Sequence, residues 1–389
     1  MNSIYRNNFF KLSNDNYSKS DNNNIDKINK ILNKDRLVII TWMKNIWKIN
    51  FIKELIHNFQ LTNNYFYFNK DIDQENKINS NLELLKLLND YIQLYKIPKI
   101  VILQNISKIN WIKDFISYLY KERYKVILIW NDIKIAWIKE IEILNNPINN
   151  LSDDLKYWSL REIKDLELNI LKEKFLKLTI SDIFLNSIFK DFSVKSINLY
   201  TFTITFLSKN NIFLSLRDLH KKLDKTNKIS LKTTIDYIDF SLQSKILKRC
   251  YRYDIKNKKE ITSKAKYYFT DNWIRNSLND FNLKKELLTE NLIFNILYYN
   301  NFQIYSGLNW KFEFSFYWKN EWEKLFIHIS KQSRKEEIKK EINKLLKIWK
   351  EWNKYLLVES IEKLNIKKLK YDSVEIIEIY DFIQNFKQK

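Results

Sequence analysis

Residues 36–41 read RLVIIT, and the chain continues with WMKNIWKI through residue 49. The first of these stretches is a short, apolar, β-branched run, which is typical of a buried strand. The segment that follows, residues 49–59, places four apolar side chains on one helical face, namely Phe51, Leu55, Ile56 and Phe59. A strand, a connection and a helix are therefore predicted in this order.

The alternation of strands and helices continues to residue 130. Further strands are predicted at residues 64–69, 99–103 and 125–130, and helices at residues 82–95 and 111–120. Each predicted strand is apolar throughout, which is typical of a parallel sheet covered on both faces. Ligands of such sheets bind at the carboxyl ends of the strands. We therefore expect an α/β domain over residues 31–150.

The second half of the chain has a different pattern. After a helical linker at residues 151–195, three short helices and two β-like segments follow, an order typical of a winged helix at residues 196–270. Residues 271–389 alternate helices with β-like runs and predict a separate small α/β domain. Residues 1–30 are rich in Asn, Ser and Asp, and they are predicted to form a loose leader.

The composition limits the class of protein. The chain has 389 residues, of which 45% are hydrophobic, so it can form two or three packed domains. Its apolar runs are far shorter than the roughly 18 residues of a membrane-spanning helix, and its start lacks the apolar core of a signal peptide. One cysteine and three distant histidines argue against a disulfide framework or a zinc site. We expect a cytoplasmic protein with no membrane partner and no structural metal.

The net charge of +21 leaves two readings open. A basic surface attracts DNA and other polyanions. However, one glycine and two prolines beside abundant Asn, Ile and Lys indicate a strong A+T bias in the gene, which also raises the lysine content. A solvated lysine coat is therefore the alternative to a nucleic-acid partner.

The connection after the first strand has the spacing of a phosphate-binding loop, G-x-x-x-x-G-K-[ST], in which backbone N–H groups and the lysine hold phosphates. Lys48 stands at the lysine position, but tryptophans occupy both glycine positions, and isoleucine replaces the Mg²⁺-binding hydroxyl. The candidate nucleotide-binding residues are Trp42, Met43, Lys44, Asn45, Ile46, Trp47, Lys48 and Ile49. By themselves, these residues also fit an ordinary strand–loop–helix connection.

Longer stretches add a family resemblance. Residues 41–48 with 53–56 (KELI) resemble the T-G-x-x-x-x-G-K loop and following helix of AAA-type ATPases that carry a winged helix and a C-terminal restriction-endonuclease-like domain. Residues 248–259 (KRCYRYDIKNKK) are similar to that family's R-Y-D-x-K-G-K-K stretch. Residues 266–277 (KYYFTDNWIRNS) are similar to its K-Y-Y-F-T-D-x-G-L-R-N stretch. The resemblance extends from about residue 35 to about residue 357.

The resemblance implies ATP as the ligand, with Mg²⁺ if hydrolysis survives. If one residue is deleted, Gln104 and Asn105 fall on the family's Asp-Glu pair, and either Asn131 or Asp132 takes its polar sensor position. Neutral amides cannot take up a proton at pH 7, so hydrolysis is expected to be impaired or lost. Trp111 matches the family's own tryptophan, whereas other tryptophans, including Trp273, stand where the family has glycine. We hypothesise that many of these are UGA codons that the organism reads as glycine.

The resemblance also implies sites in the second half of the chain. The winged helix suggests phosphate contacts along a DNA duplex, with Lys232, Thr233, Thr234, Arg252, Lys256 and Lys258 as the candidates; a structural or protein-binding winged helix is the alternative. Glu290, Ser315 and His328 fall on nuclease positions, but they lack the clustered carboxylates and lysine of a two-metal site, so no cleavage is expected. Glu290 as a solvated or capping carboxylate and His328 as a satisfied core residue are the structural readings.

Two functions follow from these observations. The first is an ATP-binding, AAA-type protein with degenerate catalytic motifs, and the second is a non-enzymatic DNA- or protein-binding regulator with the same fold. The family's arginine finger is not identifiable, because Ile138 and Lys139 stand where a Gly-Arg pair is expected. The oligomeric state is therefore left open.

Overall fold

The structure is a computed structural model that describes residues 22–41, 52, 55–59, 64–70, 78–129, 139–142, 155–156, 168–189, 192–299, 303–309, 312–319, 324–332, 334–348, 353–362, 370–371 and 373–387. The chain divides into two compact units, residues 1–146 and 147–389. The five-part division predicted from the sequence is finer than this, and it stays a prediction.

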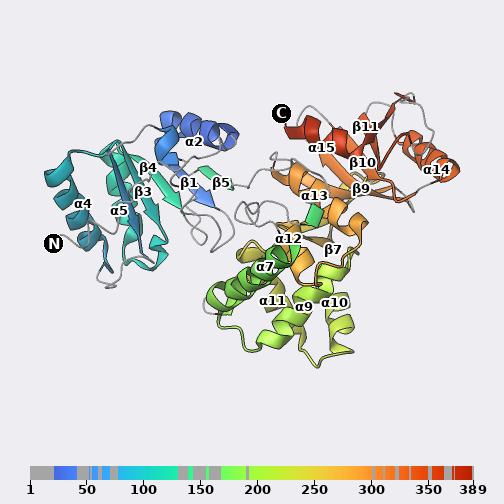
Figure 1. Ribbon diagram of the computed structural model, residues 1–389, viewed down its shortest axis with the longest axis horizontal. Coiled ribbons are helices and arrows are strands. Elements are labelled where there is room, and N and C mark those ends of the chain that lie inside the picture. Colours follow the sequence, from blue (N-terminus) through green and yellow to red (C-terminus); the bar gives the residue numbers. More distant parts are fainter. Residues whose placement is uncertain are drawn as a thin grey trace. The chain divides into compact units, whose positions relative to one another are not determined.

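The first unit contains a five-stranded parallel sheet. Its strands are β1 (Leu37–Thr41), β2 (Tyr65–Asn69), β3 (Ile100–Gln104), β4 (Lys125–Ile129) and β5 (Lys139–Glu142). Their order across the sheet is β2-β3-β4-β1-β5, and every pairing is parallel. The predicted parallel sheet is confirmed, and Figure 1 shows the strands fanning side by side.

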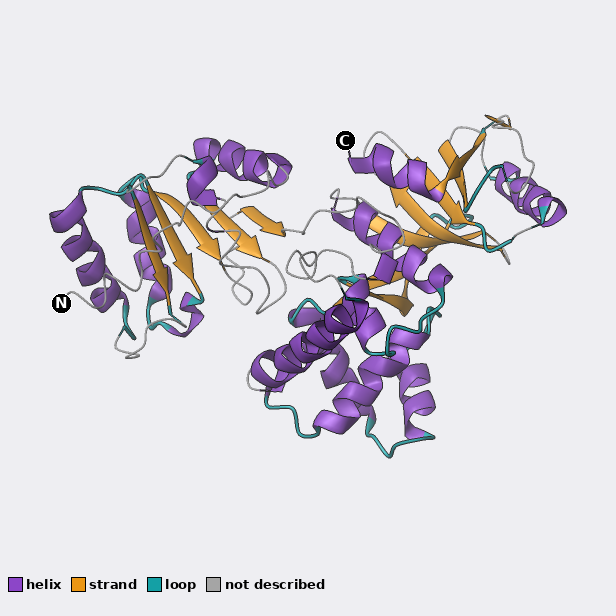
Figure 2. Cartoon of the chain, viewed as in Figure 1, coloured by secondary structure: helices purple, strands orange, loops and turns teal. Residues whose placement is uncertain are grey.

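Helices cover both faces of this sheet (Figures 1 and 2). One face packs against α4 (Asn81–Tyr95) and α5 (Ile112–Lys121), which follows the short 3₁₀ helix Ile106–Lys108. The other face packs against α2 (Asn22–Lys34) and helical residues 55–58. Because Ile25, Ile28 and Leu32 of α2 are buried, the predicted loose leader is wrong for residues 22–30.

The second unit begins with helices and ends in a mixed sheet of eight strands. The helices are α7 (Asn169–Ile183), the π-helix Phe184–Phe189, α9 (Ile197–Lys209), α10 (Leu216–Asp224), α11 (Leu231–Gln243), α12 (Asn272–Ser277), α13 (Lys285–Tyr299), α14 (Lys335–Leu346) and α15 (Ile379–Lys387). The strands are β6 (Leu247–Asp254), β7 (Lys259–Phe269), β8 (Gln303–Asn309), β9 (Phe312–Lys319), β10 (Lys324–Ile329), β11 (Asn353–Val358), β12 (Lys370–Tyr371) and β13 (Val374–Glu378).

The predicted order of three helices and a hairpin is present as α9, α10, α11, β6 and β7. However, β6 pairs with β7 on one side and with β8 on the other, so the hairpin belongs to the same sheet as the C-terminal strands. The boundary predicted at residue 270 therefore does not separate two sheets. Among the residues that the structure describes, no helix combines the length and apolarity needed to cross a bilayer.

Candidate functional site

The carboxyl edge of the five-stranded sheet is the candidate nucleotide site. Strand pairing aligns Ile40 with Ile129, Ile129 with Gln104, and Gln104 with Asn69, so these four residues form one row near that edge. β1 lies inside the sheet, between β4 and β5, and Thr41 is its last residue. The predicted phosphate-binding connection therefore leaves the sheet from an interior strand.

Gln104 lies on the sheet face that packs against helical residues 55–58, because it continues the alternation of Ile100 and Ile102. It is buried, and its Oε1 accepts a hydrogen bond of 2.8 Å from the Tyr67 hydroxyl. The side chain at the end of β3 is therefore a neutral amide that is already hydrogen-bonded within the protein. Nothing in the sequence indicates this contact, because its two residues are 37 positions apart.

Asn105 begins the next turn. Its backbone is left-handed, with φ 54° and ψ 35°, a conformation that asparagine tolerates better than most residues. Its N–H donates to the carbonyl of Ile129 over 3.2 Å, which ties the ends of β3 and β4 together. Gln104 and Asn105 are therefore both placed at the predicted edge.

The remaining candidates for this site, Trp42 to Ile49 and Asn131, lie outside the described residues. Their roles stay predictions. Asn69 and Tyr67 are further residues at or near this edge that the sequence did not single out, and both are buried.

The nuclease-like candidates meet around one pocket of about 460 Å³ in the second unit. Glu290, Ser315 and His328 all line it, together with Lys266 and Glu313. The structure therefore brings together three residues that are far apart in sequence. Among the described residues, no group of three or more His, Cys, Asp and Glu side chains is arranged to hold a metal ion.

The same pocket contains a buried ion pair between Lys266 and Glu290. Lys266 Nζ lies 3.3 Å from Glu290 Oε1 and 3.3 Å from Glu313 Oε1, and the Tyr268 hydroxyl donates to Glu290 Oε1 over 2.9 Å. Burial acts to raise the pKa of Glu290, but the charges of Lys266 and Lys331 outweigh it and hold this pKa below its ordinary value. Glu290 is thus a buried, paired carboxylate, and its reading as a solvated or capping group is wrong.

Ser315 and His328 have structural contacts. The Ser315 Oγ accepts the backbone N–H of Ile329 over 3.0 Å. His328 Nε2 lies 3.5 Å from Glu341 Oε1, while the buried Nδ1 of His328 has no hydrogen-bond partner among the described residues. His328 is therefore a partly buried residue of the pocket wall, and only one of its ring nitrogens has a partner among the described residues.

The six DNA-binding candidates differ in their exposure and in their contacts. Lys232 is exposed near the start of α11, and Lys256 and Lys258 are exposed in the turn between β6 and β7. Thr234, by contrast, is fully buried and donates to the Ser230 carbonyl, so its prediction as a DNA contact is wrong.

The other two candidates have local partners. The Thr233 hydroxyl lies 2.8 Å from that of Ser230 at the start of α11. Arg252 lies over the Phe213 ring and pairs with Glu313 at 3.5 Å, which ties its guanidinium to the protein.

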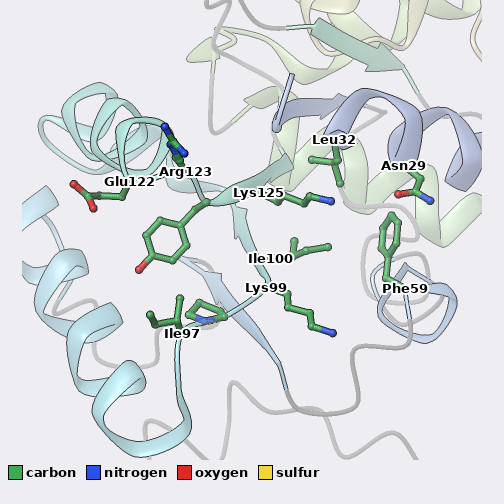
Figure 3. Close-up of a pocket in the computed structure, with 11 residues that line it drawn as sticks. Asn29, Leu32, Phe59, Ile97, Lys99, Ile100, Glu122, Arg123 and Lys125 are labelled. Carbon is green, nitrogen blue, oxygen red and sulfur yellow. The ribbon is translucent and has the colours of Figure 1, made fainter. Parts of the chain in front are cut away.

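A second pocket, of about 500 Å³, lies at the opposite edge of the five-stranded sheet (Figure 3). It is lined by Lys99 and Ile100 at the start of β3 and by Lys125 at the start of β4. Figure 3 shows Lys99 and Lys125 extending to the same side. Because this is the amino edge of the strands, the pocket is separate from the candidate nucleotide site.

Comparisons with known proteins give a distant structural similarity but no family. No protein-family model matches it, and no curated protein matches it. Among solved structures, it is similar to a Walker-type ATPase of Pyrococcus abyssi, with a TM-score of 0.45 and 9% sequence identity over 67% of this chain and 96% of that chain. This TM-score is too low for the similarity to assign a function to this chain.

Proposed function

We propose that this chain is an ATP-binding protein of the AAA type whose hydrolysis is impaired or lost. The observation that supports the proposal most directly is the position of β1, whose carboxyl end leads from the interior of a parallel sheet into residues 42–49. Open α/β sheets bind ligands at this edge. Lys48 is the residue proposed to reach the β- and γ-phosphates, as the resemblance implies.

The residue types at the end of β3 and at position 49 support weak or absent ATP hydrolysis. ATP hydrolysis depends on positioning water and stabilising charge, commonly with Mg²⁺ held by hydroxyl and carboxylate oxygens. Gln104 offers an amide whose Oε1 accepts from Tyr67, and residue 49 is isoleucine. These residues do not fit a Mg²⁺ site, and no catalytic step through a metal is proposed.

Titration of the purified chain with ATP tests the proposal. Saturable binding is expected, and Lys48→Ala should weaken it strongly, whereas Lys232→Ala in the second unit should leave it unchanged. Replacing Trp42 and Trp47 with glycine should tighten binding if the recoding hypothesis is correct. Absence of saturable binding in both the tryptophan and the glycine forms would reject nucleotide binding.

The alternative is a non-enzymatic DNA- or protein-binding regulator. It is supported by three exposed lysines, Lys232 in α11 and Lys256 and Lys258 in the turn between β6 and β7. Duplex DNA binding whose affinity falls steeply with added salt would favour it. Lys232→Ala and Lys258→Ala should then each reduce the salt dependence, whereas Lys48→Ala should not.

A further inference from the structure

The pocket at the amino edge of the five-stranded sheet is called the amino-edge pocket, and it lies away from the carboxyl edge of the strands. Its volume of about 500 Å³ falls within the range of small-molecule sites, roughly 300–1,000 Å³. β3 and β4 are neighbours, and the pairing of Ile100 with Lys125 brings the starts of both strands to the pocket wall. The pocket is therefore built on two adjacent strands of the sheet.

The described residues that line the amino-edge pocket carry more positive than negative charge. The charged ones are Lys99, Glu122, Arg123 and Lys125. Figure 3 shows the side chains of Lys99 and Lys125 extending toward the side where Phe59 lies, whereas the Glu122 carboxylate points to the other side. The two ammonium groups therefore share one side of the pocket, away from the acidic side chain of the described lining.

Both ammonium groups can receive an anion. Lys99 is exposed, and among the described residues its side chain has no ion pair and no hydrogen bond. Lys125 Nζ donates to Asn33 Oδ1 over 2.6 Å. Because asparagine is neutral, this contact positions the ammonium without compensating its charge, and it uses one of three donors.

Helix ends do not explain these two lysines. The partial negative charge at a helix C-terminus favours cations in the last turn. Lys34 of α2 and Lys121 of α5 occupy such last turns. Lys99, by contrast, directly precedes β3, and Lys125 is the first residue of β4. The helix dipoles therefore account for the lysines at the helix ends but not for those of the pocket.

An apolar surface adjoins the two ammonium groups. Leu32, Phe59 and Ile100 line the pocket and belong to one hydrophobic cluster. Lys125 emerges on the same face of the sheet, because residues paired across neighbouring strands share a face. Leu32 and Ile100 are buried, whereas Phe59 is only partly buried. The pocket thus combines two positive charges with an aromatic ring that a ligand can reach.

We propose that the amino-edge pocket binds a small phosphate monoester with an aromatic or other apolar body. A phosphate monoester carries a charge of about −1.5 to −2 at pH 7, which suits two ammonium groups better than a single carboxylate does. Lys99 and Lys125 hold the phosphate, and the body packs against Phe59. The proposal does not rest on nucleotide binding, because the carboxyl edge of the sheet takes no part in it.

Calorimetric titration of the full chain with phenyl phosphate tests the proposal, in low-salt buffer because salt screens exposed charges. Saturable binding is expected. It should be tighter than the binding of inorganic phosphate, which has no apolar body, and of benzoate, which has a single charge. Lys99→Ala should weaken phenyl phosphate binding about tenfold, because a charge-assisted hydrogen bond is lost. Lys99→Arg keeps the charge and should retain most of the affinity.

Lys86→Ala is the matched control, because Lys86 is an exposed lysine of α4 that does not line the pocket. It removes the same charge from the same unit, and its affinity should equal that of the parent. No saturable binding, an unchanged affinity in Lys99→Ala, or equal weakening in Lys86→Ala would overturn the proposal. Benzoate binding as tight as phenyl phosphate would overturn the phosphate, and inorganic phosphate binding as tight would overturn the apolar body.

Discussion

Two tryptophans occupy opposite kinds of environment. Trp273 is fully buried in the first turn of α12, and its backbone N–H donates to the carboxylate of Asp271, the N-cap residue. Trp111 is 73% exposed, and its backbone is left-handed at φ 59°, a region that bulky residues seldom adopt. In the resembling family, Trp273 stands at a glycine position and Trp111 at a tryptophan position. A motif match gives the residue type at a position but not its backbone conformation or its burial.

Replacing these residues with glycine should therefore have opposite effects. Trp273→Gly removes a buried indole, which should cost about 3–5 kcal/mol of unfolding free energy. Trp111→Gly relieves left-handed strain and should stabilise the chain by about 1 kcal/mol. Urea unfolding measures both. A Trp273→Gly protein at least as stable as the parent would instead support glycine as the natural residue there.

The Lys266–Glu290 pair should make stability depend on pH. The folded pKa of Glu290 is lowered, so its ionised form stabilises the fold above the unfolded pKa, and this contribution is lost as pH falls through the folded value. Lys266→Met leaves the buried carboxylate short of its main partner and should cost about 3–5 kcal/mol at pH 7. The cost should shrink in acid, where Glu290 is neutral.

Urea unfolding of Lys266→Met at neutral and acidic pH checks this prediction. Lys264→Met is the control, because Lys264 pairs with Asp218 at the surface, at 3.7 Å and half exposed. Surface pairs contribute little to stability. An equal loss at both pH values would contradict the assigned role of Glu290.

At the level of single elements, apolar strands were predictable and polar ones were not. β1 to β4 agree with their predicted ranges because each is apolar along its length. β5 has the sequence KEIE, with no apolar run to mark it. The sequence pattern predicts a β-like run only at residues 266–270, whereas β7 starts at Lys259, because its first part is exposed and polar. Asn-rich α2 was missed because composition obscured the spacing of Ile25, Ile28 and Leu32.

The start of α4 gives a prediction for an element. The Ser80 hydroxyl accepts the N–H of Glu83, whose carboxylate accepts the N–H of Ser80, forming a capping box. Ser80→Ala should cost about 1 kcal/mol of unfolding free energy, with the loss confined to the first unit. Ser80→Asp, which retains a capping oxygen, should restore most of it. Hydrogen exchange of the backbone amides in α4 would locate the loss of stability in Ser80→Ala. Unaltered protection of these amides would contradict the prediction.

For the whole molecule, the sequence could indicate an α/β unit followed by helices and further strands, since strand and helix patterns are local. It could not show that β6 pairs with β8, because this contact joins residues about fifty positions apart and decides that the hairpin shares a sheet with the C-terminal strands. The same holds for the pocket that gathers Lys266, Glu290 and His328. Long-range pairing therefore set the limit of prediction for both fold and site.

The two compact units predict how ATP affects unfolding. Each has its own core, so thermal unfolding of the full chain should show two transitions, assignable by comparison with residues 1–146 and residues 147–389 made separately. Because a ligand stabilises only the state that it binds, ATP at about 100 times its dissociation constant should add about 2.7 kcal/mol to the first unit alone. Lys48→Ala should abolish this shift without moving the second transition. A shift confined to the second unit would place the nucleotide site away from the β1 edge, because no part of that edge belongs to residues 147–389.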